Sequence, residues 1–303
     1  MTPFGLVFMC LGLVARGLAL QNLVETLKAN NATTLVSLID QAGLTNTLAL
    51  GDGPFTILAP TDAAFAKIPA ADLQSVTGDV KALTNILLYH VSNGETFLWD
   101  LKTGRFLTSL NGHMVRVYST AGHHLYFNNA EAIKTEIQAT NGVIYLIDEV
   151  LDVPEGTILQ ILKNPAYNLT QFAQLVHAAR EDAIFNTSGG SQRLTVFVPN
   201  NDAFGALSPD FLHTASTYIN ARNLADYHTH VGTMHASSLS GKDGHITTKY
   251  SGHQITLTHD QGSGEPLLNK LARFTLTDIE AEDGVVHVIS HVLIPSSLAP
   301  IVG

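Results

Sequence analysis

Residues 55–65 have the sequence FTILAPTDAAF, and residues 194–204 have the related sequence LTVFVPNNDAF. Each stretch begins with a short apolar run, which is typical of a buried strand. A proline ends the run, because proline cannot donate to a β-ladder. Thr61 or Asp62 in the first stretch, and Asn200 in the second, stand where a helix N-cap is expected. Both stretches therefore predict the same unit of strand, cap and helix.

Two further pairs of markers show that the chain repeats itself. The pair Tyr89-His90 recurs as Tyr227-His228, and GVIYLI at 142–147 recurs as GVVHVI at 284–289. The three kinds of marker occur in the same order in both halves and at a nearly constant offset. That offset, about 140 residues, is far longer than a solenoid unit. The chain is therefore predicted to contain two homologous domains.

The predicted domains cover residues 20–154 and 155–303. They are joined at 153–157, a short segment that contains proline and glycine but no flexible Gly/Ser tract. We therefore expect the two domains to hold a restricted relative orientation.

Hydrophobic spacing predicts helices early in each repeat and strands later. DVKALTNILLY at 79–89 has helical spacing, and Asn141-Gly142 predicts a type I′ hairpin turn. Strands are expected at 113–118, 123–127, 132–137 and 143–151, and in the second repeat at 252–258, 274–279 and 285–293. Helices followed by strands indicate an α+β fold.

The N-terminus is predicted to be a signal peptide, residues 1–19. Its apolar run at 4–15 is too short to span a bilayer and is suited to a signal-peptide core. Gly17 and Ala19 offer the small residues that precede a cleavage site. A buried N-terminal helix is the alternative, because no basic residue precedes the run. Cleavage would remove Cys10, the single cysteine, so the mature protein would be stable without disulfides.

The composition excludes several classes of protein. Apolar residues make up 45% of the chain, which excludes a disordered protein. The net charge is −10 and no basic block occurs, so nucleic-acid binding is not expected. The chain ends SSLAPIVG without a long apolar tail, so no stable membrane anchor is expected.

The three repeated markers resemble the conserved segments of the fasciclin domain family. TILAPTDAAF, the Tyr-His pair and NGVIYLIDEVL, with their counterparts in the second repeat, match the family's motifs in order, and they cover nearly the whole chain after residue 19. The resemblance implies two tandem domains, each a wedge of β-sheet with packed helices. It also implies a secreted glycoprotein of cell adhesion or extracellular matrix, without enzymatic activity or cofactor. Its partners would be a cell-surface or matrix protein, a glycan, or a second copy of the chain.

The Tyr-His pairs are candidate adhesion contacts, because this region is linked to integrin binding in some members of the family. They comprise Tyr89, His90, Tyr227 and His228. The structural interpretation, which we favour, is that each histidine forms local hydrogen bonds and fixes a turn. Thr61 and Asn200 are the partners expected for the histidines.

Three Asn-x-Ser/Thr triplets predict N-glycosylation, at Asn31, Asn168 and Asn186. The first two occupy equivalent places near the start of each repeat, and Asn186 precedes a Ser/Gly-rich stretch.

The alternative function is a carbohydrate- or metal-dependent enzyme. Of the 14 histidines, 10 follow residue 154, including His228-x-His230 and His287-x₃-His291. The acidic residues Glu280, Glu282 and Asp283 are close in sequence and would suit a glycosidase. We expect no metal site and no catalytic residues, because there is no His-Glu-x-x-His run, no nucleophile elbow and no cysteine ligand after cleavage.

Histidine also predicts a pH effect. Residues 155–303 carry a net charge of −5, and ten protonated histidines would bring it to +5; residues 20–154 carry −6 and would reach only −2. Mild acid would thus give the two domains net charges of opposite sign, which predicts pH-dependent self-association or binding to acidic glycans.

Overall fold

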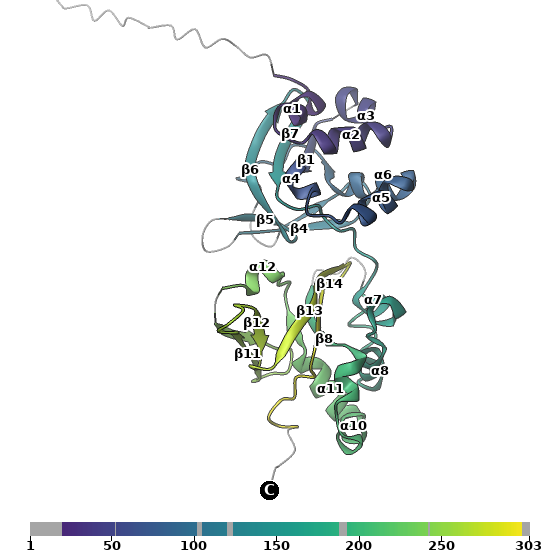
Figure 1. The fold of residues 1–303 in the computed structure, drawn as a ribbon, viewed down its shortest axis with the longest axis vertical. Helices are drawn as coiled ribbons and strands as arrows, with labels where there is room; N and C mark the ends of the chain where they lie inside the picture. The colour runs from purple at the N-terminus through teal and green to yellow at the C-terminus, as the bar shows by residue number, and fades with distance from the viewer. Residues whose placement is uncertain are drawn as a thin grey trace, which may run out of the picture.

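The computed structural model describes residues 20–51, 53–101, 105–119, 124–187, 193–241 and 243–298. The predicted signal peptide, Cys10 and the C-terminal residues 299–303 lie outside these ranges. The chain forms two units stacked along the long axis of the molecule, the first in purple to teal and the second in green to yellow (Figure 1).

Both units follow one plan, with helices first and a mixed sheet after them. The first unit contains α1 Leu23–Ala29, α2 Thr33–Gln41, α3 Thr45–Leu50, β1 Phe55–Pro60, α4 Asp62–Phe65, α5 Ala70–Gly78, α6 Val80–Tyr89, β2 Val91–Asn93, β3 Phe106–Thr108, β4 Met114–Ser119, β5 Leu125–Phe127, β6 Ala130–Ala139 and β7 Gly142–Ile147.

The second unit repeats this order. It contains α7 Ile158–Lys163, η1 Pro165–Tyr167, α8 Thr170–Ala178, β8 Leu194–Pro199, α9 Asn201–Gly205, α10 Pro209–Ala215, α11 Tyr218–Tyr227, β9 Thr229–Val231, α12 Ala236–Leu239, β10 Gly244–Thr247, β11 Gln254–His259, β12 Pro266–Leu268, β13 Ala272–Ala281 and β14 Gly284–Ile289. The predicted α+β fold with two tandem domains is therefore confirmed.

The two sheets have matching strand orders, β2-β1-β7-β6-β5-β4-β3 and, in reverse, β10-β11-β12-β13-β14-β8-β9. β1 pairs with β7 in parallel, and β8 with β14 in parallel; the other pairs are antiparallel. The quoted stretches form these central strands. As predicted, Thr61 caps α4 by accepting from the Ala64 amide, and Asn200 caps α9 in the same way.

Each unit has its own apolar core. The buried apolar clusters of the first unit lie within residues 23–151, and those of the second within residues 158–293. In each unit, one cluster packs between the helices and one face of the sheet, and the other lies on the opposite face. Two separate cores of this kind indicate two units that bury their apolar surface independently.

Most predicted strands agree with the structure within two residues at each end, but the last strand of each repeat was predicted too long. β7 ends at Ile147 rather than residue 151, and β14 ends at Ile289 rather than residue 293. The amides of Leu151 and Leu293 donate to histidine rings instead of to a strand. The chain leaves the sheet at this point because these two amides bind the histidine ring at the end of a helix rather than a carbonyl group of a neighbouring strand.

Candidate functional site

The two Tyr-His pairs lie at equivalent helix ends. α6 ends at Tyr89 and α11 at Tyr227, and the following histidine is the C-cap of each helix. All four side chains are buried. The apolar side chains of each helix belong to the buried core of its domain, so its last turn carries the pair into that core.

Each histidine joins the end of its helix to the segment that follows the last strand. His90 Nδ1 lies 2.9 Å from the Ile86 carbonyl oxygen, and the Leu151 amide donates to His90 Nε2 over 3.0 Å. The second ring repeats this: His228 Nδ1 lies 2.8 Å from the Leu224 oxygen, and the Leu293 amide donates to Nε2 over 2.9 Å. These contacts require a neutral ring with its proton on Nδ1.

Burial keeps both rings neutral at physiological pH. It lowers the pKa of His90 and of His228 from the usual 6.5 to about 4, against the opposing effect of the helix carbonyl that each ring contacts. His287 is also buried, and desolvation lowers its pKa as well. His228 therefore stays uncharged in mild acid, and the lowered pKa of His287 also opposes its protonation, so the predicted charge reversal of the second domain is reduced.

The tyrosines of the pairs bind asparagines that the sequence analysis missed. Asn128 Nδ2 donates to the Tyr89 hydroxyl over 2.9 Å, and Asn269 Nδ2 donates to the Tyr227 hydroxyl over 3.0 Å. Both asparagines have φ of 50°, a left-handed conformation that asparagine tolerates. The offset between them falls within the range of the other repeated markers. The repeat spacing could therefore have found them.

The ring nitrogens and hydroxyls of all four side chains are thus engaged inside the fold. The expected partners Thr61 and Asn200 were wrong, because their oxygens cap α4 and α9 instead. An adhesion contact at these pairs stays a prediction. It would require a partner to recognise the surface above them, since the side chains themselves are enclosed.

The three asparagines of the glycosylation triplets are exposed. Asn31 and Asn168 both adopt left-handed φ, 59° and 56°, just before α2 and α8. Asn168 Oδ1 accepts from Asn201, and Asn186 Oδ1 accepts from the Thr157 hydroxyl. Their occupancy by glycans stays a prediction.

The histidines of the second domain are spread through the unit rather than gathered. His228 is enclosed, while the His230 ring faces the Thr247 carbonyl 2.7 Å away. Across the described residues, no group of three or more His, Cys, Asp or Glu side chains is placed to hold a metal ion. Asp283 accepts from the amides of Ile158 and Thr187, so it ties the start of α7 to the sheet.

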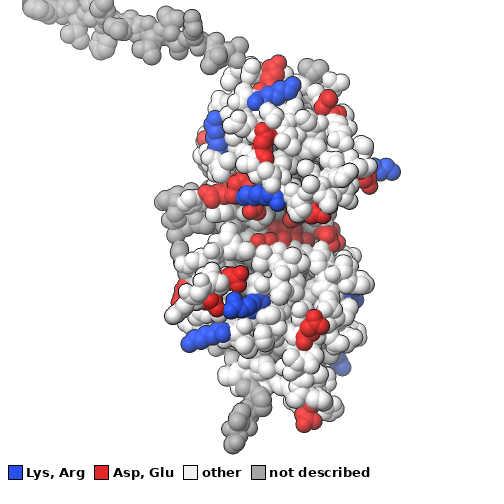
Figure 2. All heavy atoms as spheres, in the orientation of Figure 1, with Lys and Arg blue, Asp and Glu red and all other residues white. Residues whose placement is uncertain are grey.

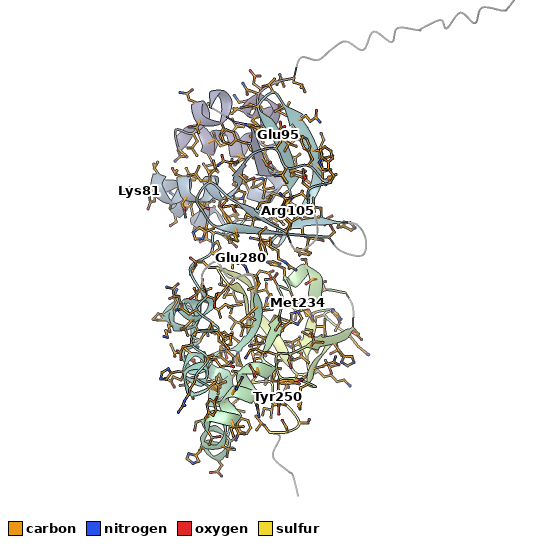
Figure 3. All side chains as sticks on the ribbon, turned by 180° about the vertical axis from the view of Figure 1, so that it is seen from behind. Lys81, Glu95, Arg105, Met234, Tyr250 and Glu280 are labelled. Carbon is orange, nitrogen blue, oxygen red and sulfur yellow. The ribbon has the colours of Figure 1, made fainter. Side chains whose placement is uncertain are left out.

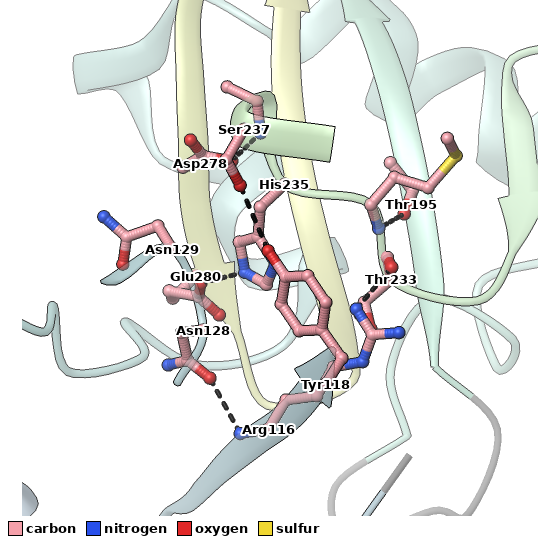
Figure 4. Close-up of polar contacts among 12 residues, drawn as sticks. Arg116, Tyr118, Asn128, Asn129, Thr195, Thr233, His235, Ser237, Asp278 and Glu280 are labelled. Carbon is pink, nitrogen blue, oxygen red and sulfur yellow. Dashed lines mark hydrogen bonds and ion pairs between the residues drawn. The ribbon is translucent and has the colours of Figure 1, made fainter. Parts of the chain in front are cut away.

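The most elaborate polar contact lies between the two domains (Figure 4). Arg116 on β4 donates through Nη1 to the Thr233 carbonyl over 2.5 Å. The Tyr118 ring stacks on the His235 ring at 5.9 Å between centroids and 3° between planes. The Tyr118 hydroxyl lies 3.1 Å from Ser237 Oγ. These contacts join the two domains directly, and the restricted orientation expected from the short linker stays a prediction.

Behind the Tyr118 contact, His235 and Glu280 of the second domain bind each other. Both are buried, and His235 Nε2 lies 2.6 Å from Glu280 Oε1. Glu280 lies where the two domains meet (Figure 3). Asn128, which binds Tyr89, also accepts from the Arg116 amide. The buried Tyr-His cluster of the first domain thus positions the strand that contacts the second.

Removing the junction contacts is expected to free the domains. We expect Arg116→Ala combined with Tyr118→Ala to raise the radius of gyration and broaden the interdomain distances in small-angle scattering. The unfolding midpoints of the domains should change little, because the separate cores are untouched. The matched control is Arg180→Ala with Tyr218→Ala, another Arg–Tyr pair whose charge-to-ring distance is 5.2 Å, within the second domain. A scattering curve identical to that of the wild type would contradict this role of the junction.

The segment of the second domain that contacts the first domain at this junction, around His235 and Ser237, has an exposed counterpart in the first domain. The Met234 amide donates to Thr195 Oγ1, as the Thr96 amide does to Thr56 Oγ1. By this register His235 and Ser237 correspond to Phe97 and Trp99. Met234 lies beside the junction, and Glu95 lies in the first domain away from it (Figure 3).

Trp99 is the most exposed large apolar side chain among the described residues, at 70%. Its ring stacks on Phe97 with centroids 4.5 Å apart. The Leu98 amide donates a hydrogen bond to Glu136 Oε1 over 2.7 Å, so the backbone next to the tryptophan is held in place. The sequence analysis missed this residue, although it is the single tryptophan of the chain.

The sequence model of the fasciclin domain matches residues 30–154 and 167–295. The chain is 29% identical to transforming growth factor-beta-induced protein ig-h3 of Sus scrofa over 290 residues, covering 92% of this chain and 40% of the relative. It is 28% identical to human periostin over 276 residues, covering 90% of this chain and 31% of the relative. The chain thus spans less than half the length of these two relatives.

Among solved structures, a FAS1 domain pair from the insect cell adhesion molecule Fasciclin I is similar. The TM-score is 0.44 at 17% identity, covering 89% of this chain and 99% of the other. Among the described residues, no helix has the length and apolar character needed to cross a membrane.

Proposed function

Because the chain belongs to the fasciclin domain family, we propose that it is a secreted, non-enzymatic adhesion or matrix-binding protein. Residues 1–19 act as the signal peptide, and residues 20–154 and 155–303 form the two domains of the mature protein. Family matches in both halves support the proposal. Its partner is a cell-surface or matrix protein, a glycan, or a second copy of the chain. Asn31, Asn168 and Asn186 carry glycans in the secreted form.

The adhesive surface that we assign is the edge around Trp99, defined by Phe97, Leu98 and Trp99. The observation that carries this assignment is the correspondence with the second domain, whose equivalent edge docks on a neighbouring domain. In the first domain the same edge is exposed and more apolar. Tryptophan is enriched among the residues that dominate binding energy at interfaces.

The test is binding of the secreted protein to the native cell surface or matrix. Trp99→Ala is expected to weaken binding by about 2 kcal/mol, roughly thirtyfold, as for a central interface residue. The matched control is Ile219→Ala in the second domain, because Ile219 is similarly exposed at 67%. The control should bind like the wild type, and both variants should unfold at the wild-type midpoint. Equal binding by Trp99→Ala and the wild type would contradict the assigned surface.

A glycan array on which both binding and hydrolysis are measured distinguishes the proposed adhesive function from the enzymatic alternative. Binding without turnover supports the proposed function. Release of sugar products by the wild-type protein would contradict it.

A further inference from the structure

The first domain contains an apolar cavity of about 480 Å³, a volume within the usual range for small-molecule sites. Its walls come from four helices and from the segment after β7. Apolar side chains on these walls include Leu38 of α2, Phe65 of α4, Leu73 and Val76 of α5, and Ile86 of α6. A cavity lined in this way favours an apolar occupant, because filling it removes apolar surface from water.

One wall of the cavity is loosely attached. Every residue of α5 is half-buried or exposed, and Leu73 and Val76 are its apolar contacts with the core. In the second domain the matching helix α10 buries Ala215 and packs Phe211 against the core. Phe211 follows Leu73 by the same offset that separates the two Tyr-His pairs, so a larger side chain stands there. A helix with few buried contacts is among the easier parts of a domain to move, and α5 can therefore admit a ligand.

The other end of the cavity is polar and opens toward the domain junction. Asn129, Glu149 and Asp152 line both this cavity and a second one of about 520 Å³, whose far wall includes Ser237 and Asp278 of the second domain. The described lining of the second cavity holds three carboxylates and neither lysine nor arginine. Acidic side chains gather where the two domains meet (Figure 2).

The polar end offers acceptors for which the protein supplies few donors. Asn129 Nδ2 donates to Glu149 over 2.6 Å, but its buried Oδ1 finds no hydrogen-bond donor among the described residues. Asp152 lies on the exposed rim of this end, where desolvation and nearby carboxylates led by Glu280 raise its pKa. Lys67 is the cation in the described lining, and its exposed ammonium is 3.7 Å from Asp148 and 3.5 Å from Glu149. Its charge is therefore directed to those two carboxylates rather than to Asp152 or Asn129.

We propose that this cavity binds a small cationic amphiphile, with its apolar body among α2, α5 and α6 and its amine against Asn129 and Asp152. The apolar walls select the body of the ligand. The acceptor-rich end selects the head, because an ammonium group carries three donors and a positive charge. The proposal does not depend on the adhesive role, since the cavity and the Trp99 edge are different surfaces of the first domain.

The test compares decylamine, decanol and decanoate by calorimetric titration of the full-length secreted protein at neutral pH, below their micelle concentrations. We expect decylamine to bind about fivefold more tightly than either of the others, which is the most that one solvent-accessible charge pair contributes. Equal affinity for the three, tighter binding of decanoate, or undetectable binding of decylamine would overturn the proposal.

Two variants locate the site. Leu73→Trp fills the apolar end and should abolish binding of decylamine, while Gln74→Trp on the exposed side of α5 should leave it unchanged. Asp152→Asn should weaken decylamine binding about fivefold and leave decanol binding unaffected, because it removes charge but little volume. Decylamine binding that survives both Leu73→Trp and Asp152→Asn would place the ligand elsewhere and overturn the assignment. Loss of binding in the Trp99→Ala protein is not expected, so failure here and failure of the adhesive role remain distinguishable.

Discussion

Lowering the pH from 7 to 4 is expected to remove about 3 kcal/mol of the stability of the second domain through His228 alone. The ring is enclosed, and its pKa falls from 6.5 to about 4 on folding. Protons therefore bind more tightly to the unfolded chain than to the folded one. The stability that the neutral ring provides is complete above pH 6.5 and is lost as the pH falls toward 4.

A comparison with His228→Gln isolates this effect. At pH 7 the variant should lose about 3 kcal/mol, because the Leu293 amide and the Leu224 carbonyl lose a buried partner. At pH 4 the difference between variant and wild type should shrink to about zero, since the wild type has then lost the same amount. The measurement is urea unfolding followed by circular dichroism. Fluorescence of Trp99, the single tryptophan, marks the transition of the first domain.

The matched control is His213→Gln, which changes an exposed histidine of the same domain. Its stability should follow the wild type at every pH. A difference between wild type and His228→Gln that stays constant from pH 7 to pH 4 would contradict the burial of a neutral ring.

The same comparison applies to His90 in the first domain, where another group acts in the opposite direction. The folded-state pKa of Asp152 is raised by desolvation and by neighbouring carboxylates. Its protonation in acid removes both costs, so it adds stability as the pH falls toward the pKa that Asp152 has in the unfolded chain. Asp152 therefore offsets part of the stability that His90 loses in acid. In a comparison of the His90 variant with the wild type, the contribution of Asp152 to the pH dependence cancels, because both proteins carry this residue.

The repeats allowed much of the fold to be predicted, because the same local chemistry occurs twice. Pro60 and Pro199 end equivalent strands, and Thr61 and Asn200 cap equivalent helices. The length of the last strands was wrong, since the segment DEVL at 148–151 does not reveal that the amide of its last residue is already paired with a histidine ring.

The junction between the domains could not be predicted from the repeat, because its residues break the repeat. The Arg116 amide binds Asn128 as the Thr256 amide binds Asn269. By this register Arg116 and Tyr118 take the places of Thr256 and Thr258. The longer side chains at these positions in the first domain form hydrogen bonds with the second domain. A comparison of the two repeats shows only that the residues differ, and not what they contact.

The hairpin before β7 shows how tertiary contacts decide a local conformation. The type I′ turn predicted at Asn141-Gly142 was wrong, because such a turn needs positive φ at both central residues. Thr140 and Asn141 form the turn, since Ala139 pairs with Gly142, and neither has positive φ. Asn141 instead accepts from the Leu23 amide and donates to the Leu48 carbonyl. Gly142 is thus the first residue of the strand.

The glycine is needed at that place by the close approach of two parallel strands. A Cβ added at Gly284 would lie 1.9 Å from the Leu194 carbonyl oxygen, and one at Gly142 would lie 2.1 Å from the Phe55 oxygen. Both contacts involve backbone atoms, so no side chain can move aside. The strands would have to separate where β14 and β8, or β7 and β1, begin to pair.

Gly284→Ala is therefore expected to destabilise the second domain by about 4 kcal/mol, at the upper end for a single overpacked methyl group, because the central hydrogen bonds of the sheet must break. Hydrogen exchange resolved by peptide should show lost protection in residues 155–298 and unchanged protection in the first domain. Gly142→Ala should give the reverse pattern and also shift the Trp99 fluorescence transition. Gly244→Ala is the control, because its added Cβ meets nothing within 4 Å. Loss of protection in both domains with either variant would mean that the two cores unfold as one cooperative unit, contrary to their separation in the structure.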